Sequence, residues 1–257
     1  MVDWIAYREL AWAETILSPP EDDADETASF VSAINQHASE PVKTLLHLGC
    51  GGGINDFTFK KHYQVTGIDV NEPMLAVARQ LNPEVTYQIG DMRTIELNQQ
   101  FDAVAIPDSI MHLLTVDDLR QAMATVGRHL RPGGLLLLVM HAREDFQENN
   151  FVYTGCRDEI EITLFENNYV VKPAGDVWEA TVVYLIRRQG ELEIHSGRCR
   201  GGLFPLATWH TLFEQAGLEV LQETLSDDTY DRFLMNQGKY RLRRFVCRYS
   251  GQSSHPA

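Results

Sequence analysis

The chain has 257 residues, enough for one large α/β domain with an elaboration or for two small domains. Hydrophobic residues make up 44% of it and charged residues 23%, as in an ordinary globular protein with a full core. The formal net charge of −14 argues against a broad nucleic-acid or anionic-membrane surface and favours a small or neutral substrate.

The chain shows no sign of a targeting or membrane segment. It lacks a run of about 18 apolar residues, and its first residues lack a basic region followed by an apolar one. Its four cysteines follow no Cys-x-x-Cys or Cys/His metal pattern. We therefore expect a cytoplasmic monomer or homodimer with reduced thiols, no bound metal and no membrane contact.

The first elements are predicted to be helical. Residues 3–17 place Trp4 and Tyr7 at helical spacing, which predicts an amphipathic helix that ends at the prolines 19 and 20. Residues 21–26 form an acidic run, interpreted as a solvated loop. Its carboxylates also favour the dipole of a second helix over residues 27–37.

A buried strand then runs into a glycine-rich turn with Gly49, Gly51 and Gly53. Glycine costs more backbone entropy than other residues, so the cluster indicates positive φ angles or a closely approaching ligand. Cys50, within the turn, is interpreted as a small apolar filler rather than a nucleophile. A helix over residues 54–61 would direct its free N–H groups at a ligand above the glycines. The pattern indicates a nucleotide site.

The next strand, residues 64–69, ends in Asp69, 16 residues after Gly53. A carboxylate at this place can accept hydrogen bonds from both ribose hydroxyls of an adenosine cofactor. The glycine spacing is G-x-G-x-G and lacks the third glycine of the dinucleotide fingerprint G-x-G-x-x-G. Spacing alone therefore indicates an adenosine site and disfavours a nicotinamide dinucleotide.

A helix is predicted to begin at residues 71–75, and a strand over residues 85–89 leads into Asp91 and Met92. A carboxylate beside a backbone N–H matches the amine donor and ring-nitrogen acceptor of adenine. The buried strand 101–106 ends at Pro107 and Asp108, where ligands of open α/β sheets bind. Asp108 could contact a substrate amine, serve as a base or cap the following helix.

The sheet is predicted to continue after a helix over residues 119–130 and a tight turn, with a fifth strand over residues 135–140. His141 follows that strand directly. A histidine beside a cofactor cleft has a pKa near 6.5 and can take a proton from an amine or hydroxyl. His141 is therefore the preferred titratable candidate for catalysis.

Residues 150–202 alternate between apolar and polar side chains, which predicts three antiparallel strands at 159–165, 177–184 and 190–195. Turns are expected at 167–168 and 189–190. Arg198 and Arg200 could hold a phosphate or carboxylate, or lie on a strand surface. A last helix at 204–216 and strands at 218–225 and 240–247 complete the sheet, with arginines of the final strand protecting an edge.

Five segments in this order resemble the class I S-adenosylmethionine-dependent methyltransferases: LLHLGCGGG, GIDVNEPML, QIGDMR, FDAVAIPDSIMHL and LRPGGLLLLV. The resemblance runs over residues 44–139 and resumes over 204–247. Within that superfamily the chain is most similar to small-molecule members, including amino-sugar N-methyltransferases. DNA and glutamine N-methyltransferases of the family carry Asn/Asp-Pro-Pro-Tyr where this chain has Ile106 to Ser109, which disfavours a nucleic-acid substrate.

The resemblance implies an α/β fold: a Rossmann-like, mostly parallel seven-stranded sheet with helices on both faces and an antiparallel β cap over the active site. A single domain, 1–257, would consist of a cofactor-binding core, 43–142 and 204–249, and a substrate cap inserted at about 150–202. S-adenosyl-L-methionine would be the cofactor and S-adenosyl-L-homocysteine its product.

The resemblance also assigns residue roles. Tyr7 would close over the cofactor, while Asp108 and His141 would face a small-molecule acceptor. His112 would contact cofactor or substrate, or merely pack. The cofactor-binding set comprises Gly49, Cys50, Gly51, Gly53, Asp69, Val70, Met74, Asp91, Met92, Pro107 and His112.

Three alternatives stay open at the level of sequence. The protein could methylate a protein or tRNA, act as an NAD(P)-dependent oxidoreductase, or bind an adenosine cofactor without catalysis. The acceptor atom, N or O, is also open. A general base need not exist, because the sulfonium of the donor is already activated and the enzyme's main task is positioning.

Overall fold

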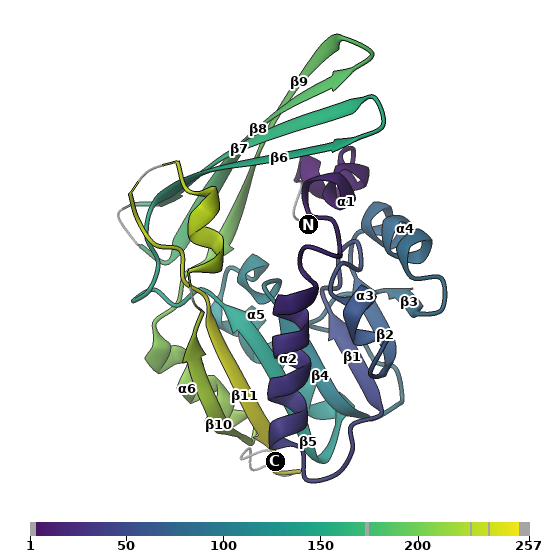
Figure 1. Ribbon diagram of the computed structural model, residues 1–257. Coiled ribbons are helices and arrows are strands. Elements are labelled where there is room, and N and C mark those ends of the chain that lie inside the picture. The colour runs from purple at the N-terminus through teal and green to yellow at the C-terminus, as the bar shows by residue number, and fades with distance from the viewer. Residues whose placement is uncertain (1–3, 173–174, 227, 236, 252–257) are drawn as a thin grey trace.

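The computed structural model describes residues 4–172, 175–226, 228–235 and 237–251. Two sheets dominate it (Figure 1): a seven-stranded sheet flanked by helices and, above it, a four-stranded sheet. The N-terminal segment lies between the two. The predicted fold class, a Rossmann-like sheet with an antiparallel cap, is confirmed.

The large sheet has the strand order β10-β11-β5-β4-β1-β2-β3. Strands β1 to β5 run parallel to one another, and β11 runs antiparallel to both β5 and β10. The order reverses between β1 and β4, so their following loops diverge and leave a crevice at the carboxyl ends of the strands. The strands are β1 Thr44–Leu48, β2 Gln64–Asp69, β3 Thr86–Ile89, β4 Phe101–Pro107, β5 Leu130–Met140, β10 Leu218–Leu225 and β11 Arg243–Tyr249.

Helices cover both faces of this sheet because its strands are apolar on both sides. Leu45, Leu135 and Leu137 pack on one face against α2 Ala24–His37 and the region of α3 Asp56–Phe59. Their neighbours along the strands, such as Leu46 and Leu136, pack on the other face. That face is covered by α5 Val116–His129 and α6 Leu206–Gln215. Helix α4 Glu72–Leu81 lies beside β2 and β3.

The cap has four strands rather than the three predicted: β6 Asn149–Arg157, β7 Ile160–Val170, β8 Val177–Arg188 and β9 Glu191–Gly202. The predicted turn at Asn167 and Asn168 is wrong, because both residues pair with β6 inside the ladder. The β6–β7 hairpin turns instead at Asp158, which has a positive φ of 53°. The predicted turn at Gln189 and Gly190 is confirmed, with φ angles of 49° and 86°.

The continuous helix predicted near the N-terminus is wrong. The chain forms three short pieces, η1 Ile5–Tyr7, η2 Ala11–Ala13 and α1 Glu14–Leu17. Leu10 and Ile16 pack beneath the cap in one cluster with Ile162 and Leu164, whereas Tyr7 lines a cavity below it. A segment that must serve two differently oriented surfaces cannot keep a single helical face.

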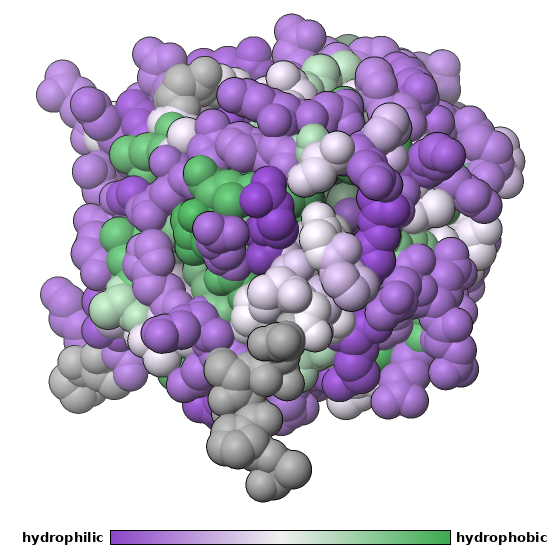
Figure 2. All heavy atoms as spheres, turned by 90° about the horizontal axis from the view of Figure 1, so that it is seen from below, coloured by the Kyte–Doolittle hydropathy of each residue, from purple (hydrophilic) through white to green (hydrophobic). Residues whose placement is uncertain are grey.

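The arginines of the last strand do not protect a sheet edge, because β11 is an interior strand and β10 and β3 are the edges. Arg243 instead pairs with Asp145 and Glu223. From the end opposite the cap, the surface is mostly hydrophilic, with apolar areas of which the most extended lies left of the centre (Figure 2). None of the helices in the described residues is long and apolar enough to cross a membrane. Two further single-turn helices are η3 Ile110–His112 and η4 Thr229–Phe233.

Candidate active site

A cavity of about 1090 Å³ lies at the carboxyl ends of β1, β2 and β4, beneath the cap. Twelve of the fourteen site residues expected from the sequence line it: Tyr7, Gly49, Cys50, Gly51, Asp69, Val70, Met74, Asp91, Met92, Pro107, Asp108 and His112. The other two, Gly53 and His141, do not. Residues that the sequence analysis did not single out also line it, among them Glu14, His47, Asn55, Arg93 and Glu179.

The glycine turn has the geometry that its composition indicates. Gly49 and Gly51 have φ angles of +72° and +53°, a region that disfavours any side chain. A Cβ on Gly49 would lie 2.3 Å from the Oγ of Ser109. Gly53 faces away from the cavity, because a Cβ there would meet Asn82 and Tyr87 at 2.7 Å. The missing side chain at Gly53 lets the loop pack on the protein at this point, and its contact with a cofactor stays a prediction.

Asp69 lies at the end of β2 beside this turn. Its Oδ2 accepts a hydrogen bond from the Gly51 N–H at 2.9 Å, and its Oδ1 accepts from the Asn71 N–H at 2.8 Å. These backbone donors fix the carboxylate at the rim of the cavity. Oδ1 also accepts from the Asn71 side-chain amide at 3.3 Å, so Oδ2 retains the lone pair that a hydroxyl of a ligand can use.

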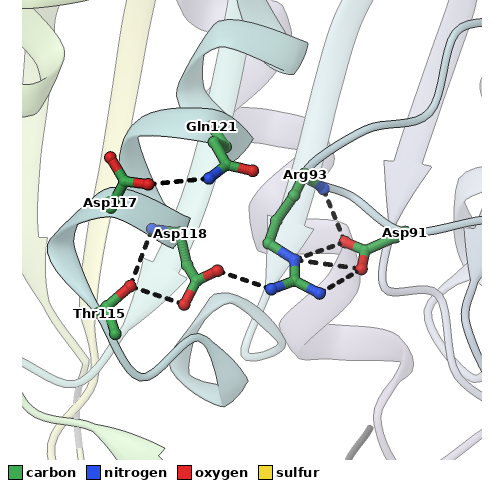
Figure 3. A network of polar contacts seen from close by, with 6 residues as sticks. All are labelled: Asp91, Arg93, Thr115, Asp117, Asp118 and Gln121. Atoms are coloured by element: carbon green, nitrogen blue, oxygen red, sulfur yellow. Dashed lines mark hydrogen bonds and ion pairs between the residues drawn. The ribbon is translucent and has the colours of Figure 1, made fainter.

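At the other side of the cavity, Asp91 belongs to an ion-pair network that the sequence did not reveal (Figure 3). Both of its oxygens accept from the Arg93 guanidinium at 2.6–3.1 Å, and Arg93 also donates to Asp118 at 2.6 Å. Thr115 in turn donates to Asp118 at 2.7 Å. Hydrogen bonds from Arg93 lower the pKa of Asp91. The Arg93 backbone N–H also donates to Oδ1 at 2.8 Å. Asp91 is therefore a fixed anion, and a ligand amine must share its oxygens with Arg93.

Tyr7 and His112 meet in the cavity wall. The Tyr7 hydroxyl lies 3.1 Å from His112 Nε2, and both rings pack edge-on with Trp4. Burial lowers the pKa of His112 to about 4 and raises the pKa of Tyr7 well above 10. At neutral pH the imidazole is uncharged and the phenol keeps its proton.

Asp108 follows β4, and the residue is exposed to the space of the cavity, which protein encloses. Its φ of 58° is uncommon for a residue with a side chain and is often found at functional sites. Burial, followed by the charges of Glu26 and Glu166, raises its pKa to about 8. It does not cap η3: the N-cap position is Ser109, without a side-chain cap bond.

His141 lies outside this cavity. Its ring is buried among Phe146, Trp178 and Tyr240, and its Nε2 lies 3.0 Å from the Tyr240 hydroxyl. Burial lowers its pKa to about 4. His141 thus does not line the cavity with Asp108 and Tyr7, although burial and then the charge of Asp108 raise the pKa of its hydrogen-bond partner Tyr240. A catalytic role for His141 stays a prediction.

The cap contributes charged groups to the cavity. Glu179, on β8, accepts from Arg200 Nε at 2.9 Å and from the hydroxyl of Tyr169, and Arg198 lies 3.8 Å from it. The two arginine side chains remain 72% and 59% exposed. Each guanidinium carries five N–H donors, so most of them are available to an anionic ligand.

Among the described residues that line the cavity, three have a buried polar atom without a hydrogen-bond partner: Glu14 Oε2, His47 Nε2 and His112 Nδ1. His47 Nδ1 lies 2.7 Å from Asp56 Oδ1, and Asp56 Oδ2 accepts from the Tyr87 hydroxyl at 2.9 Å. His47 could have been found from the sequence, because it is a polar residue inside an otherwise apolar strand. Glu14 gave none, because its place depends on how the N-terminal segment folds back.

Among the described residues, no group of three or more His, Cys, Asp or Glu side chains is placed to hold a metal ion. A doubly wound sheet with an adenosine-type site at its switch point and a cap above it defines a cofactor-dependent transferase or oxidoreductase class. Comparison with known proteins separates these two.

Residues 45–134 match the family model described as a methyltransferase domain. The chain is 30% identical over 198 residues to a dTDP-3-amino-3,6-dideoxy-alpha-D-glucopyranose N,N-dimethyltransferase of Streptomyces fradiae, covering 76% of this chain and 77% of the relative. It is 32% identical over 119 residues to a dTDP-4-amino-2,3,4,6-tetradeoxy-D-glucose N,N-dimethyltransferase of Saccharopolyspora spinosa, covering 46% of this chain. That alignment spans about half of the Saccharopolyspora relative, 47%.

Among solved structures, an S-adenosylmethionine-bound amino pentose methyltransferase of Micromonospora echinaspora superposes with a TM-score of 0.71 at 26% identity. The superposition covers 88% of this chain and 90% of the other. The chain belongs to the class I S-adenosylmethionine-dependent methyltransferases. Within them it is similar to the amino-sugar N-methyltransferases.

Proposed function

We propose that this protein transfers a methyl group from S-adenosylmethionine to an amine of a small molecule that enters beneath the cap. The observation that carries the proposal is the continuity of the cavity. A single space reaches from the glycine turn and Asp69 past Asp108 to the cap residue Arg198. Donor and acceptor can therefore lie in one enclosure, as in-line transfer requires.

The residues present fit the cofactor. Gly49 and Gly51 leave a turn without side chains, Asp69 offers a lone pair for the ribose, and Met74 and Met92 offer apolar contact for the adenine. The unpartnered oxygen of Glu14 lies above the turn. When bound, S-adenosylmethionine supplies an activated methyl group on a sulfonium. The protein's part is to place the acceptor and keep its lone pair free.

Three groups would serve that purpose. An amine reacts only through a free lone pair, so an acceptor that arrives as an ammonium must lose a proton. Asp108, in its ionised form, can accept that proton, because its pKa of about 8 is close to that of an amine, and it would orient the amine by a charge-assisted hydrogen bond. His112 has a pKa of about 4 and is too weak a base for this step, so its ring and the Tyr7 hydroxyl, 3.1 Å from it, would position the acceptor.

We propose further that the acceptor amine belongs to a sugar bearing a phosphate or diphosphate. Two observations support this: the relatives act on dTDP-linked amino sugars by their names, and Arg198 and Arg200 offer guanidinium donors at the cap side of the cavity. Guanidinium groups bind phosphate oxygens in a bidentate manner.

The test measures S-adenosylhomocysteine formed from S-adenosylmethionine with nucleotide-linked amino sugars. Matched sugars with a hydroxyl in place of the amine serve as controls. We expect turnover that depends on the amine and falls strongly in Asp108→Asn. Turnover of the hydroxyl analogues at the same rate would contradict the choice of an amine. No turnover above the background without acceptor, across amino sugars with and without phosphate, would contradict the proposed acceptor class.

A further inference from the structure

Two unpartnered acceptor atoms face the cavity beside the glycine turn, Glu14 Oε2 and His47 Nε2. Buried polar atoms are nearly always hydrogen-bonded in folded proteins. His47 is only 1% exposed, so water does not readily reach its ring. A ligand with several N–H or O–H donors would supply a hydrogen bond to each of these two atoms.

The carboxyl group of Glu14 can lie against the turn because Gly52 has no side chain. A Cβ on Gly52 would lie 1.8 Å from Glu14 Oε2, and one on Gly51 would lie 3.7 Å from Oε1. The backbone of Gly52 hydrogen-bonds the carboxyl group. The titratable groups that face Glu14 are themselves acids: Tyr7, Asp23, Cys50, Asp69 and Tyr184. The surroundings of this carboxyl group therefore favour a cationic ligand.

The partner of Nδ1 decides which ring nitrogen of a neutral His47 carries the hydrogen. Asp56 receives a hydrogen bond from Tyr87 on one oxygen and lies 2.7 Å from His47 Nδ1 on the other. A carboxylate only accepts hydrogen bonds, so we assign the ring hydrogen to Nδ1. In the neutral ring, Nε2 then carries the lone pair that faces the cavity.

We propose that Glu14 and His47 together bind the α-ammonium group of the cofactor's methionyl part, with Glu14 as its counter-ion. The inference rests on the proposed function, because it presumes an S-adenosylmethionine site. An ammonium has three N–H donors and a positive charge, which match one carboxylate and one imidazole acceptor.

The pairing has a measurable proton balance. Burial and the charge of Asp69 raise the pKa of Glu14 to about 8, so the free protein holds a proton there at pH 7. An ammonium beside Glu14 favours its ionised form, and the proton leaves to solvent. Binding of S-adenosylhomocysteine at pH 7 should therefore release protons, at most one for each bound ligand.

The experiment is calorimetric titration of the whole protein with S-adenosylhomocysteine and with 5′-methylthioadenosine, which lacks the amino-acid part. Buffers of different ionisation enthalpy give the number of protons released. Glu14→Gln should weaken S-adenosylhomocysteine binding roughly 10- to 100-fold, leave 5′-methylthioadenosine unchanged and abolish proton release. Gly52→Ala should act in the same direction, because its Cβ displaces Glu14 Oε2. Asp91→Asn should weaken both ligands alike.

The outcomes separate the two claims. If the folded wild type binds neither ligand, the proposed function itself fails. If it binds both, but Glu14→Gln changes their affinities equally or the wild type releases no proton, only the ammonium site is overturned. Should Glu14→Gln not fold, proton release by the wild type with S-adenosylhomocysteine, but not with 5′-methylthioadenosine, decides the matter.

Discussion

Removal of one hydroxyl tests the buried network that supports the glycine turn. Tyr87 donates to Asp56 Oδ2 at 2.9 Å and accepts from Asn82 Nδ2 at 3.0 Å, and Asn82 also donates to the carbonyl of Gly53 at 2.9 Å. Tyr87→Phe removes one hydrogen bond to a buried charge and one neutral bond. Together these should cost about 3 kcal/mol, which lowers Tm by roughly 6–12 °C in a chain of this size.

The assay is thermal unfolding of the apo-protein followed by circular dichroism, with Tyr63→Phe as the matched control. Tyr63 makes the same kind of bond to neutral partners only, Val31 O at 3.4 Å and Asn35 Oδ1 at 3.2 Å. Its loss should cost about 1 kcal/mol. If Tyr87→Phe lowers Tm no more than Tyr63→Phe, the charged network does not stabilise the turn and the reasoning is refuted.

Further predictions concern the cavity. Asp108→Asn should lower turnover by about 100-fold or more and leave the S-adenosylhomocysteine Kd nearly unchanged; an equal loss in Kd would place Asp108 in the cofactor site. His141→Gln should keep kcat within about threefold, because only a packing contact and a neutral hydrogen bond are lost, whereas a large fall in kcat with normal folding would support a catalytic role. Replacing Arg198 and Arg200 by alanine should raise the acceptor KM about tenfold or more without changing kcat, since it removes binding common to ground and transition states; an unchanged KM would exclude an anion there. The apo-protein should lose stability as pH rises from about 6.5 to 8, because the pKa values of Glu14 and Asp108, about 8 when folded, lie near 4 when unfolded. Between about pH 4 and 6.5, His112 and His141 oppose this loss, because their pKa values are about 4 when folded and near 6.5 when unfolded. Melting curves of Glu14→Gln combined with Asp108→Asn should fall less steeply with pH, and equal slopes would contradict these pKa values.

Local signals in the sequence were sufficient for much of the large sheet. The predicted strands 64–69 and 218–225 match β2 and β10 residue for residue. The predicted strand 135–140 begins five residues late, because β5 begins at Leu130, and the predicted strand 240–247 is displaced from β11 Arg243–Tyr249. The carboxyl ends of β1, β2 and β4 then follow from topology. This is why residues such as Asp69 and Asp108 could be placed together before the structure was known.

The predictions that failed concern residues whose conformation depends on contacts between segments distant in the sequence. Asn167 and Asn168 are typical turn residues, but their pairing with β6 decides their conformation. The predicted N-terminal helix is interrupted because some of its residues pack against the cap while others line the cavity. Glu14 reaches the glycine turn only through that folding back. His141 follows its strand as predicted, yet Tyr240 and Trp178 enclose it, and neither residue is near it in sequence.

The central claim is that this cavity binds S-adenosylmethionine through the residues at the ends of β1, β2 and β3. Calorimetric titration of the wild type with S-adenosylmethionine, beside Asp69→Ala, tests it most directly. The account predicts a Kd in the micromolar range, about 8 kcal/mol of binding free energy, and clear weakening in the variant because the ribose loses its acceptor. Absence of binding by the folded wild type, or equal affinity in Asp69→Ala, would contradict it.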